Sequence, residues 1–112
     1  MIPAVAKIKP QLKNDTFNGV RFTMSPATDL TGATIRTQFR KGSKTGILEK
    51  ELNISTGITI EDLTDGIFVW DAFIMDFEVG TYNYDVQVTF SGGDVKTYVE
   101  GTMAVTQDTT FV

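Results

Sequence analysis

The segment from residue 82 to residue 90 alternates apolar and polar side chains without interruption, and it constrains the fold more than any other feature. Successive side chains of a strand point to opposite faces of a sheet, so this alternation predicts a strand with one buried and one solvated face. The apolar positions of this predicted strand are Tyr82, Tyr84, Val86, Val88 and Phe90.

A second apolar run, residues 95–105, follows after a four-residue connection that contains Gly92 and Gly93. Glycine tolerates the positive φ angles that tight hairpin turns require. We therefore expect the two runs to pair as an antiparallel hairpin.

Further short apolar runs are separated by turn residues every 8 to 12 residues or so, which is typical of an all-β sandwich or barrel. Pro10 cannot donate a ladder hydrogen bond, so the first run should lie at an edge or a bend. Residues 71–79 are the one helical candidate, a single turn before Gly80. The predicted strands cover residues 5–12, 17–24, 33–40, 47–54, 58–60, 67–70, 82–90 and 95–105.

A chain of 112 residues suits a single domain, here residues 1–112, because one core of this size already buries well over half of the unfolded surface. We expect an all-β fold, an immunoglobulin-like antiparallel β-sandwich of about seven to eight strands. Its core should include Phe22, Tyr84, Val86 and Val88.

The spacing of Gly80, Tyr82 and Tyr84 resembles the tyrosine corner of immunoglobulin-like sandwiches, in which a tyrosine hydroxyl turns back to the backbone upstream. Tyr82 would be the corner residue, and Tyr84 would take the place of the cysteine found two positions later in those domains. The alternative is that Tyr82 is a half-buried aromatic residue whose hydroxyl stays in water.

The chain contains no Cys and no His, which removes disulfides, thiolate metal sites and the commonest general base. We therefore expect no enzymatic activity and no cofactor. Glu61, Asp62 and Asp65 carry the oxygen ligands that Ca²⁺ prefers, but their spacing matches no EF-hand loop. A solvated acidic turn is the preferred interpretation, with a metal site or a carboxylate pair for glycoside hydrolysis as alternatives. Asp71, Asp76 and Glu78 are further acidic residues that would lie near this turn.

Trp70, the single tryptophan, alternates with Phe68 in a predicted strand. Core or interface packing is the usual role of so large an apolar side chain. The alternative is an exposed platform on which a sugar ring stacks, which would make the chain a carbohydrate-binding or adhesion module.

Charge is divided unevenly along the chain: residues 1–50 carry a net charge of +6 and residues 51–112 a net charge of −10. If the two halves occupy different faces, the basic face of one copy can dock on the acidic face of another and form a homo-oligomer. The alternative is that the halves interleave and pair internally. The basic residues expected at such an interface are Arg36, Arg40, Lys41 and Lys44.

The acidic net charge of −4, with no aromatic residues interleaved among these basic ones, argues against nucleic-acid binding. No apolar run approaches the roughly 20 residues that a membrane-spanning helix needs. We therefore expect neither nucleic acid nor membrane as a partner.

Three segments resemble small β-sandwich virion proteins of tailed bacteriophages, including the N-terminal anchoring domain of baseplate upper proteins. They are residues 29–42, 57–70 and 80–110, and the Gly-x-Tyr-x-Tyr-Asp sequence, the Gly-Gly turn and the step Glu100, Gly101, Thr102 are their most characteristic parts. The resemblance implies a structural protein of a tail, baseplate or head-fibre assembly that contacts other virion proteins. It would be synthesised in the host cytoplasm and located in the virion. Because the chain stops soon after its last predicted strand, we expect an adaptor, decoration or anchoring piece.

Overall fold

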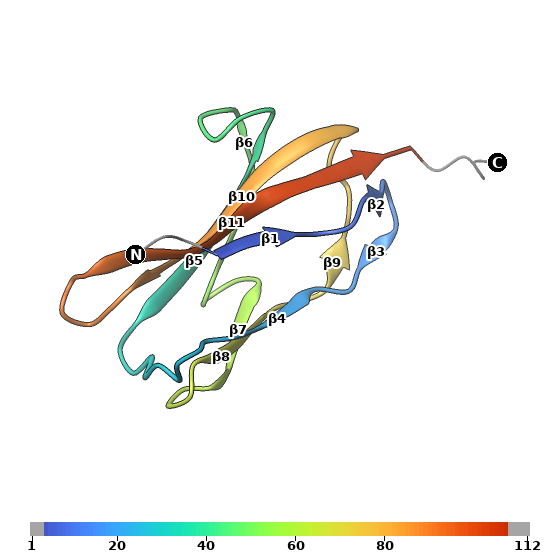
Figure 1. Ribbon diagram of the computed structural model, residues 1–112. Helices are drawn as coiled ribbons and strands as arrows, with labels where there is room; N and C mark the ends of the chain where they lie inside the picture. Colours follow the sequence, from blue (N-terminus) through green and yellow to red (C-terminus); the bar gives the residue numbers. More distant parts are fainter. Residues whose placement is uncertain (1–3, 108–112) are drawn as a thin grey trace.

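The computed structural model describes residues 4–107, and each regular element in that range is a β-strand (Figure 1). The strands are β1 (Ala4–Lys7), β2 (Gln11–Leu12), β3 (Thr16–Phe17), β4 (Val20–Thr23), β5 (Thr34–Lys41), β6 (Leu48–Asn53), β7 (Ile58–Asp62), β8 (Ile67–Trp70), β9 (Phe73–Ile74), β10 (Gly80–Thr89) and β11 (Val95–Thr106).

The strands form two packed layers. The larger sheet has the order β1-β11-β10-β5-β6, with β2 also paired to β11, and the smaller sheet has the order β4-β8-β7. Strands β3 and β9 form a separate antiparallel pair. In immunoglobulin terms β5, β10 and β11 occupy the C, F and G positions, and β4, β8 and β7 occupy B, E and D. The prediction of an all-β, immunoglobulin-like sandwich is confirmed.

Residues 4–107 contain more strands than the seven or eight predicted, because two of the predicted strands are divided. The predicted strand 5–12 is divided around Pro10 into β1 and β2, which both run parallel to β11 at the sheet edge, as the proline indicated. The predicted strand 17–24 is divided at Gly19, which has a φ of 83°. A Cβ on Gly19 would lie 2.1 Å from the carbonyl oxygen of Trp70, so only glycine allows the backbone to approach β8 this closely.

The helical prediction for residues 71–79 is wrong, because this connection is extended and contains β9. Met75 and Phe77 are buried there, whereas Ile74 and Asp76 are exposed. Burial with a period of two is the pattern of a strand. The adjacent apolar residues Ile74 and Met75 obscured this alternation in the sequence.

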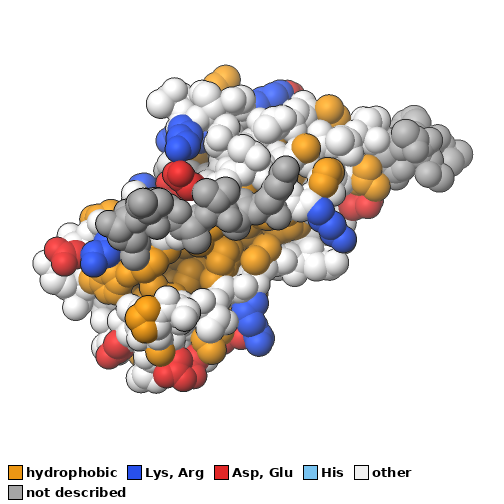
Figure 2. Space-filling model, viewed as in Figure 1, with side chains coloured by type: hydrophobic (Ala, Val, Ile, Leu, Met, Phe, Trp, Pro, Cys, Tyr) orange, Lys and Arg blue, Asp and Glu red, His pale blue; other side chains and the backbone are white. Residues whose placement is uncertain are grey.

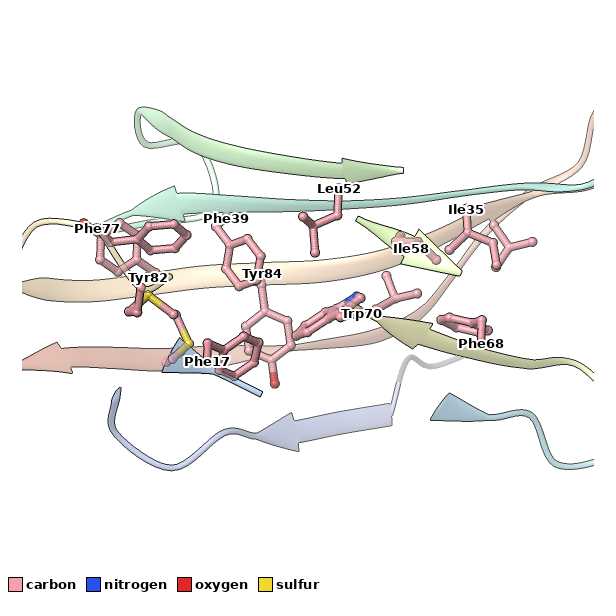
Figure 3. Close-up of a cluster of buried hydrophobic side chains, with 14 of the residues drawn as sticks. Phe17, Ile35, Phe39, Leu52, Ile58, Phe68, Trp70, Phe77, Tyr82 and Tyr84 are labelled. Atoms are coloured by element: carbon pink, nitrogen blue, oxygen red, sulfur yellow. The ribbon is translucent and has the colours of Figure 1, made fainter. Parts of the chain in front are cut away.

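Trp70 lies at the centre of the core between the two sheets, and no part of it is exposed (Figure 3). Its ring centroid lies 5.0 Å from that of Phe22, 5.4 Å from those of Phe39 and Tyr84, and 6.4 Å from that of Phe17. Tilted and edge-on contacts of this kind are favourable because the positive edge of one ring meets the negative face of another.

The indole Nε1–H of Trp70 donates a hydrogen bond of 3.0 Å to the hydroxyl of Thr37, the one buried polar residue among residues 8–107. This bond joins β8 of the smaller sheet to β5 of the larger one. An indole N–H buried without an acceptor would carry the full cost of its lost hydration. The prediction of core packing is confirmed, and the sugar platform at Trp70 is wrong because burial leaves no ring face for a ligand.

Three of the four predicted core residues, Tyr84, Val86 and Val88, are buried on β10. Phe22 on β4 is half-buried and packs against the core. Its ring stacks on that of Phe68 at a centroid distance of 5.1 Å. Phe22 therefore lies at the margin of the core rather than inside it.

We predict that Thr37→Val destabilises the fold by about 1 to 3 kcal/mol, because this nearly isosteric change leaves the Trp70 N–H without an acceptor. Thr34→Val, on the exposed face of the same strand, is the matched control and should change the free energy of unfolding by less than about 0.5 kcal/mol. Urea unfolding of both variants measures the difference. Equal effects would contradict a stabilising role for the bond.

Candidate protein–protein interface

Tyr82 at the start of β10 fixes where this strand enters the larger sheet. Its ring is fully buried, and its hydroxyl donates a hydrogen bond of 2.7 Å to the backbone oxygen of Glu78, four residues upstream. A carboxylate oxygen of Glu49 lies 3.3 Å from the same hydroxyl. Because a hydroxyl has one proton, the shorter contact is the principal bond. The predicted tyrosine corner is confirmed.

The alternation along β5 arranges the outward face of the larger sheet. Ile35, Thr37 and Phe39 of β5 point inward and are buried, so Arg36 and Arg40 between and after them point outward. The outward face of this sheet is therefore polar, and two of the four predicted interface residues lie on one strand of it. Across the ladder, Arg36 lies opposite Gln87 and Arg40 lies opposite Asn83.

Neutral oxygen atoms bind both guanidinium groups. Arg36 Nη2 donates to Gln87 Oε1 at 2.7 Å, and Arg40 donates to the backbone oxygen of Gly46 at 3.0 Å and to Gln38 Oε1 at 3.1 Å. Among the described residues no carboxylate lies within ion-pair distance of either arginine. These contacts fix the two side chains along the sheet without neutralising their charge.

The two predicted interface lysines have acidic partners. Lys41 Nζ lies 3.1 Å from a carboxylate oxygen of Glu78, and Lys44 Nζ lies 3.2 Å from one of Glu100. Both partners come from the acidic second half of the chain. The two halves therefore interleave in part, and the structure does not gather all four basic residues into one unpaired patch.

The loop between β5 and β6 borders a shallow hollow of about 130 Å³ on the outward face. Lys44 of this loop reaches over β10 to Glu100 on β11, and Arg40 bonds to Gly46 of the same loop. Side chains of both charges therefore surround the hollow. Its lining residues are Gln38, Arg40, Lys44, Asn83, Tyr84, Asp85 and Glu100.

Two apolar residues beside these arginines and lysines escaped the sequence analysis. Ile47 is 81% exposed and Leu48 is 43% exposed, and Leu48 lies opposite Arg40 in the ladder between β5 and β6. The sequence signal was two bulky aliphatic residues directly after a glycine in a polar turn. We call Arg36, Arg40, Lys41, Lys44, Ile47 and Leu48 the β5–β6 surface.

The acidic turn between β7 and β8 has a structural role. Asp62 Oδ1 accepts hydrogen bonds from the Thr64 hydroxyl at 3.2 Å and from the Asp65 backbone N–H at 3.0 Å, which shapes the turn. Glu61 forms an ion pair of 2.6 Å with Arg21. Within residues 4–107 no three acidic side chains lie close enough together to hold a metal ion.

The described part of the chain contains no helix that is long and apolar enough to span a membrane. The sequence matches no protein-family model and no curated protein. A similar solved structure is the crystal structure of CopC from Methylosinus trichosporium OB3b, which is 16% identical with a TM-score of 0.53 over 92% of this chain and 89% of that one. At this identity the likeness supports the sandwich fold alone.

Domains 3–5 of the extracellular part of Drosophila OTK give a weaker match. They are 14% identical with a TM-score of 0.32, and the match covers 97% of this chain and 34% of that one.

We predict that Tyr82→Phe lowers the free energy of unfolding by about 1 kcal/mol at neutral pH, because the part-buried hydrogen bond from the Tyr82 hydroxyl to the Glu78 backbone oxygen is lost. Tyr98→Phe is the matched control, because it removes the hydroxyl of another half-buried tyrosine. Chemical denaturation of the three proteins measures the effect. A loss below about 0.3 kcal/mol in Tyr82→Phe would contradict a stabilising corner.

The corner also predicts a dependence on alkaline pH. Burial, followed by the nearby Glu49 carboxylate, raises the pKa of Tyr82 from 10.0 to about 12. The folded state therefore holds this proton more tightly than the unfolded state. Its contribution to stability is fully present below pH 10 and is lost as the pH rises toward 12.

Urea unfolding at neutral pH and between pH 10 and 12 should show a larger alkaline loss of stability in the parent than in Tyr82→Phe. Burial also raises the pKa of Tyr84, but this residue is present in both proteins and its contribution cancels. Equal alkaline losses in the two proteins would contradict the assignment to Tyr82.

Proposed function

We propose that this chain is a non-catalytic structural component of a tailed-phage virion, which holds other virion proteins through the β5–β6 surface. One observation carries the protein-binding role: the half-exposed Leu48 lies opposite the un-neutralised Arg40, and Ile47, the most exposed large apolar side chain of the described residues, directly precedes Leu48 and bonds to the backbone of Lys41. The virion setting rests on the sequence resemblance, because a sandwich fold by itself hosts many functions.

The composition of this surface suits a protein partner. Arginine is enriched at protein–protein interfaces and among the residues that dominate their binding energy. Fully burying an isoleucine side chain contributes about 1.5 to 3 kcal/mol. Arg36 and Arg40 favour a partner with acidic groups at matching positions, and their contribution should weaken as salt screens it.

The scaffold suits the same role. Arg36 and Arg40 lie on a strand paired on both sides, and their hydrogen bonds hold them in place before a partner arrives. Side chains that are ordered in advance lose less conformational entropy on binding. A rigid polar face with an apolar corner is therefore a suitable attachment point in an assembly that must keep a fixed geometry.

The setting is tested by mass spectrometry of purified phage particles released from the strain or phage whose genome encodes the chain. The protein should be present in fixed stoichiometry to the other particle proteins. Its presence in the lysate but absence from purified particles would contradict the virion assignment.

The surface is tested by adding back variants to particles that lack the chain. Ile47→Ser should reduce incorporation by at least about tenfold while leaving the melting temperature unchanged, because the side chain is already in water in the free protein. Val95→Ser is the matched control, since Val95 is 55% exposed in the turn-side part of β11, away from this surface. The double variant Arg36→Glu and Arg40→Glu should also reduce incorporation, more strongly at low salt.

Normal incorporation of both Ile47→Ser and the double arginine variant would overturn the proposed surface. An equal loss with Val95→Ser would assign the effect to general apolar exposure instead.

A further inference from the structure

The smaller sheet ends in an open edge at β4. The strand order is β4-β8-β7, and among residues 4–107 no strand pairs with the side of β4 that faces away from β8. An unpaired edge presents a row of backbone donors and acceptors that can accept another strand.

The direction of the backbone groups on β4 follows from its pairing with β8. The N–H of Met24 donates to the backbone oxygen of Gly66, the residue directly before β8. Backbone groups of every second residue point to the same side of a strand, so those of Phe22 and Val20 also point toward β8. The backbone groups of Arg21 and Thr23 consequently point to the open edge. These two residues are the ones that an added strand would bond.

Apolar side chains lie next to this edge. Figure 2 shows them gathered in the hollow between β1 and β4, where the two sheets diverge. Val20, Phe22 and Met24 are half-buried and pack against the core, and the Phe22 ring contacts the fully buried rings of Phe68 and Trp70. The edge therefore offers hydrophobic contact as well as hydrogen bonds.

The outer strands β6 of the larger sheet and β7 of the smaller sheet are protected against such pairing. Each contains a β-bulge, and the extra residue is a glutamate: Glu49 in β6 and Glu61 in β7. Bulges and charges on an edge strand prevent the addition of another strand. β4 contains no bulge, and its one charged side chain, Arg21, is paired with Glu61 of the same chain.

We infer that two copies of this chain pair through β4, antiparallel, about a two-fold axis that passes beside Phe22. This arrangement joins the two smaller sheets into one continuous sheet. The inference rests on the proposed function, because it names a second copy of the chain as one partner in the assembly. The surface that it uses is the β4 edge, not the β5–β6 surface.

The sequence of β4 is complementary to itself in this register. A two-fold axis normal to the sheet places each residue opposite one on the same face, so Phe22 meets Phe22 and Val20 meets Met24 on the apolar side. Arg21 meets Thr23 on the solvated side, and these are the residues whose backbone groups are free to bond. Like charges do not face each other in this register. A shift by one pair in one direction would place Arg21 opposite Arg21, and a shift in the other direction would place Arg21 opposite Ser25, beyond the end of β4.

The second copy is the occupant that this pattern favours. Aromatic cross-strand pairs are stabilising, and a non-hydrogen-bonded position such as that of Phe22 brings the two side chains closest together. A partner strand of different sequence would have to reproduce both the apolar spacing and the uncharged residue opposite Arg21. β4 itself already satisfies both conditions.

The first test uses sedimentation velocity on the full chain. The parent should be a dimer in equilibrium with monomer, and Thr23→Pro should raise the dimer Kd by at least about tenfold, because each copy loses an intermolecular N–H donor. The Thr23 N–H bonds no group within the described chain, so the fold itself should persist. Thr23→Val keeps the N–H and is the matched control, which should still form the dimer.

The second test uses the absence of cysteine from the natural sequence. Phe22→Cys should form a disulfide-linked dimer under mild oxidation, because the axis brings the two positions within disulfide range. Val20→Cys, which lies opposite Met24 rather than itself, should crosslink far less.

A parent that is monomeric at every soluble concentration would overturn the inference. So would a dimer that is unaffected by Thr23→Pro, or equal crosslinking at positions 20 and 22. A dimer lost in Arg36→Glu and Arg40→Glu but kept in Thr23→Pro would assign self-association to the β5–β6 surface. Absence of the chain from phage particles would overturn the proposed function but leave a β4-linked dimer standing.

Discussion

The hydrogen bond from the Trp70 indole to the Thr37 hydroxyl, at the centre of the core, is the contact around which the two layers are arranged. Trp70 needs an acceptor because its N–H is buried, and Thr37 needs a donor because it is the buried polar residue of β5. The bond therefore specifies how β8 lies over β5, which non-directional apolar contacts alone would leave free. The rings of Phe22, Phe39 and Tyr84 then pack around the tryptophan.

Most of the fold could be predicted from local patterns. The alternation through β10 identified its buried face, and the spacing of Gly80 and Tyr82 identified the corner that begins it. The break at Gly19 could not be predicted, because it depends on how closely the backbone approaches the Trp70 carbonyl across space. The extended connection at β9 was present as an alternation but was obscured by two adjacent apolar residues.

Less of the candidate interface could be predicted. The outward position of Arg36 and Arg40 follows from strand periodicity. The ion pair of Lys44 depends on a loop folding toward β11, and that of Lys41 depends on where the connection before β10 places Glu78. Ile47 is exposed because the chain turns there, and a linear sequence does not distinguish such an isoleucine from one that begins a buried strand. Whether a charge is neutralised is likewise a property of the folded sheet.

The parallel pairing of β1 with β11 has a mechanical consequence. The first strand and the last strand run side by side in the same direction, with Ala4 opposite Val99 and Lys7 opposite Thr102. A force that pulls the chain before β1 away from the chain after β11 acts along both strands and in opposite senses. It loads all of their hydrogen bonds together in shear, instead of opening them one after another as in peeling. A domain whose first and last strands pair in parallel therefore resists a pulling force applied between its two ends.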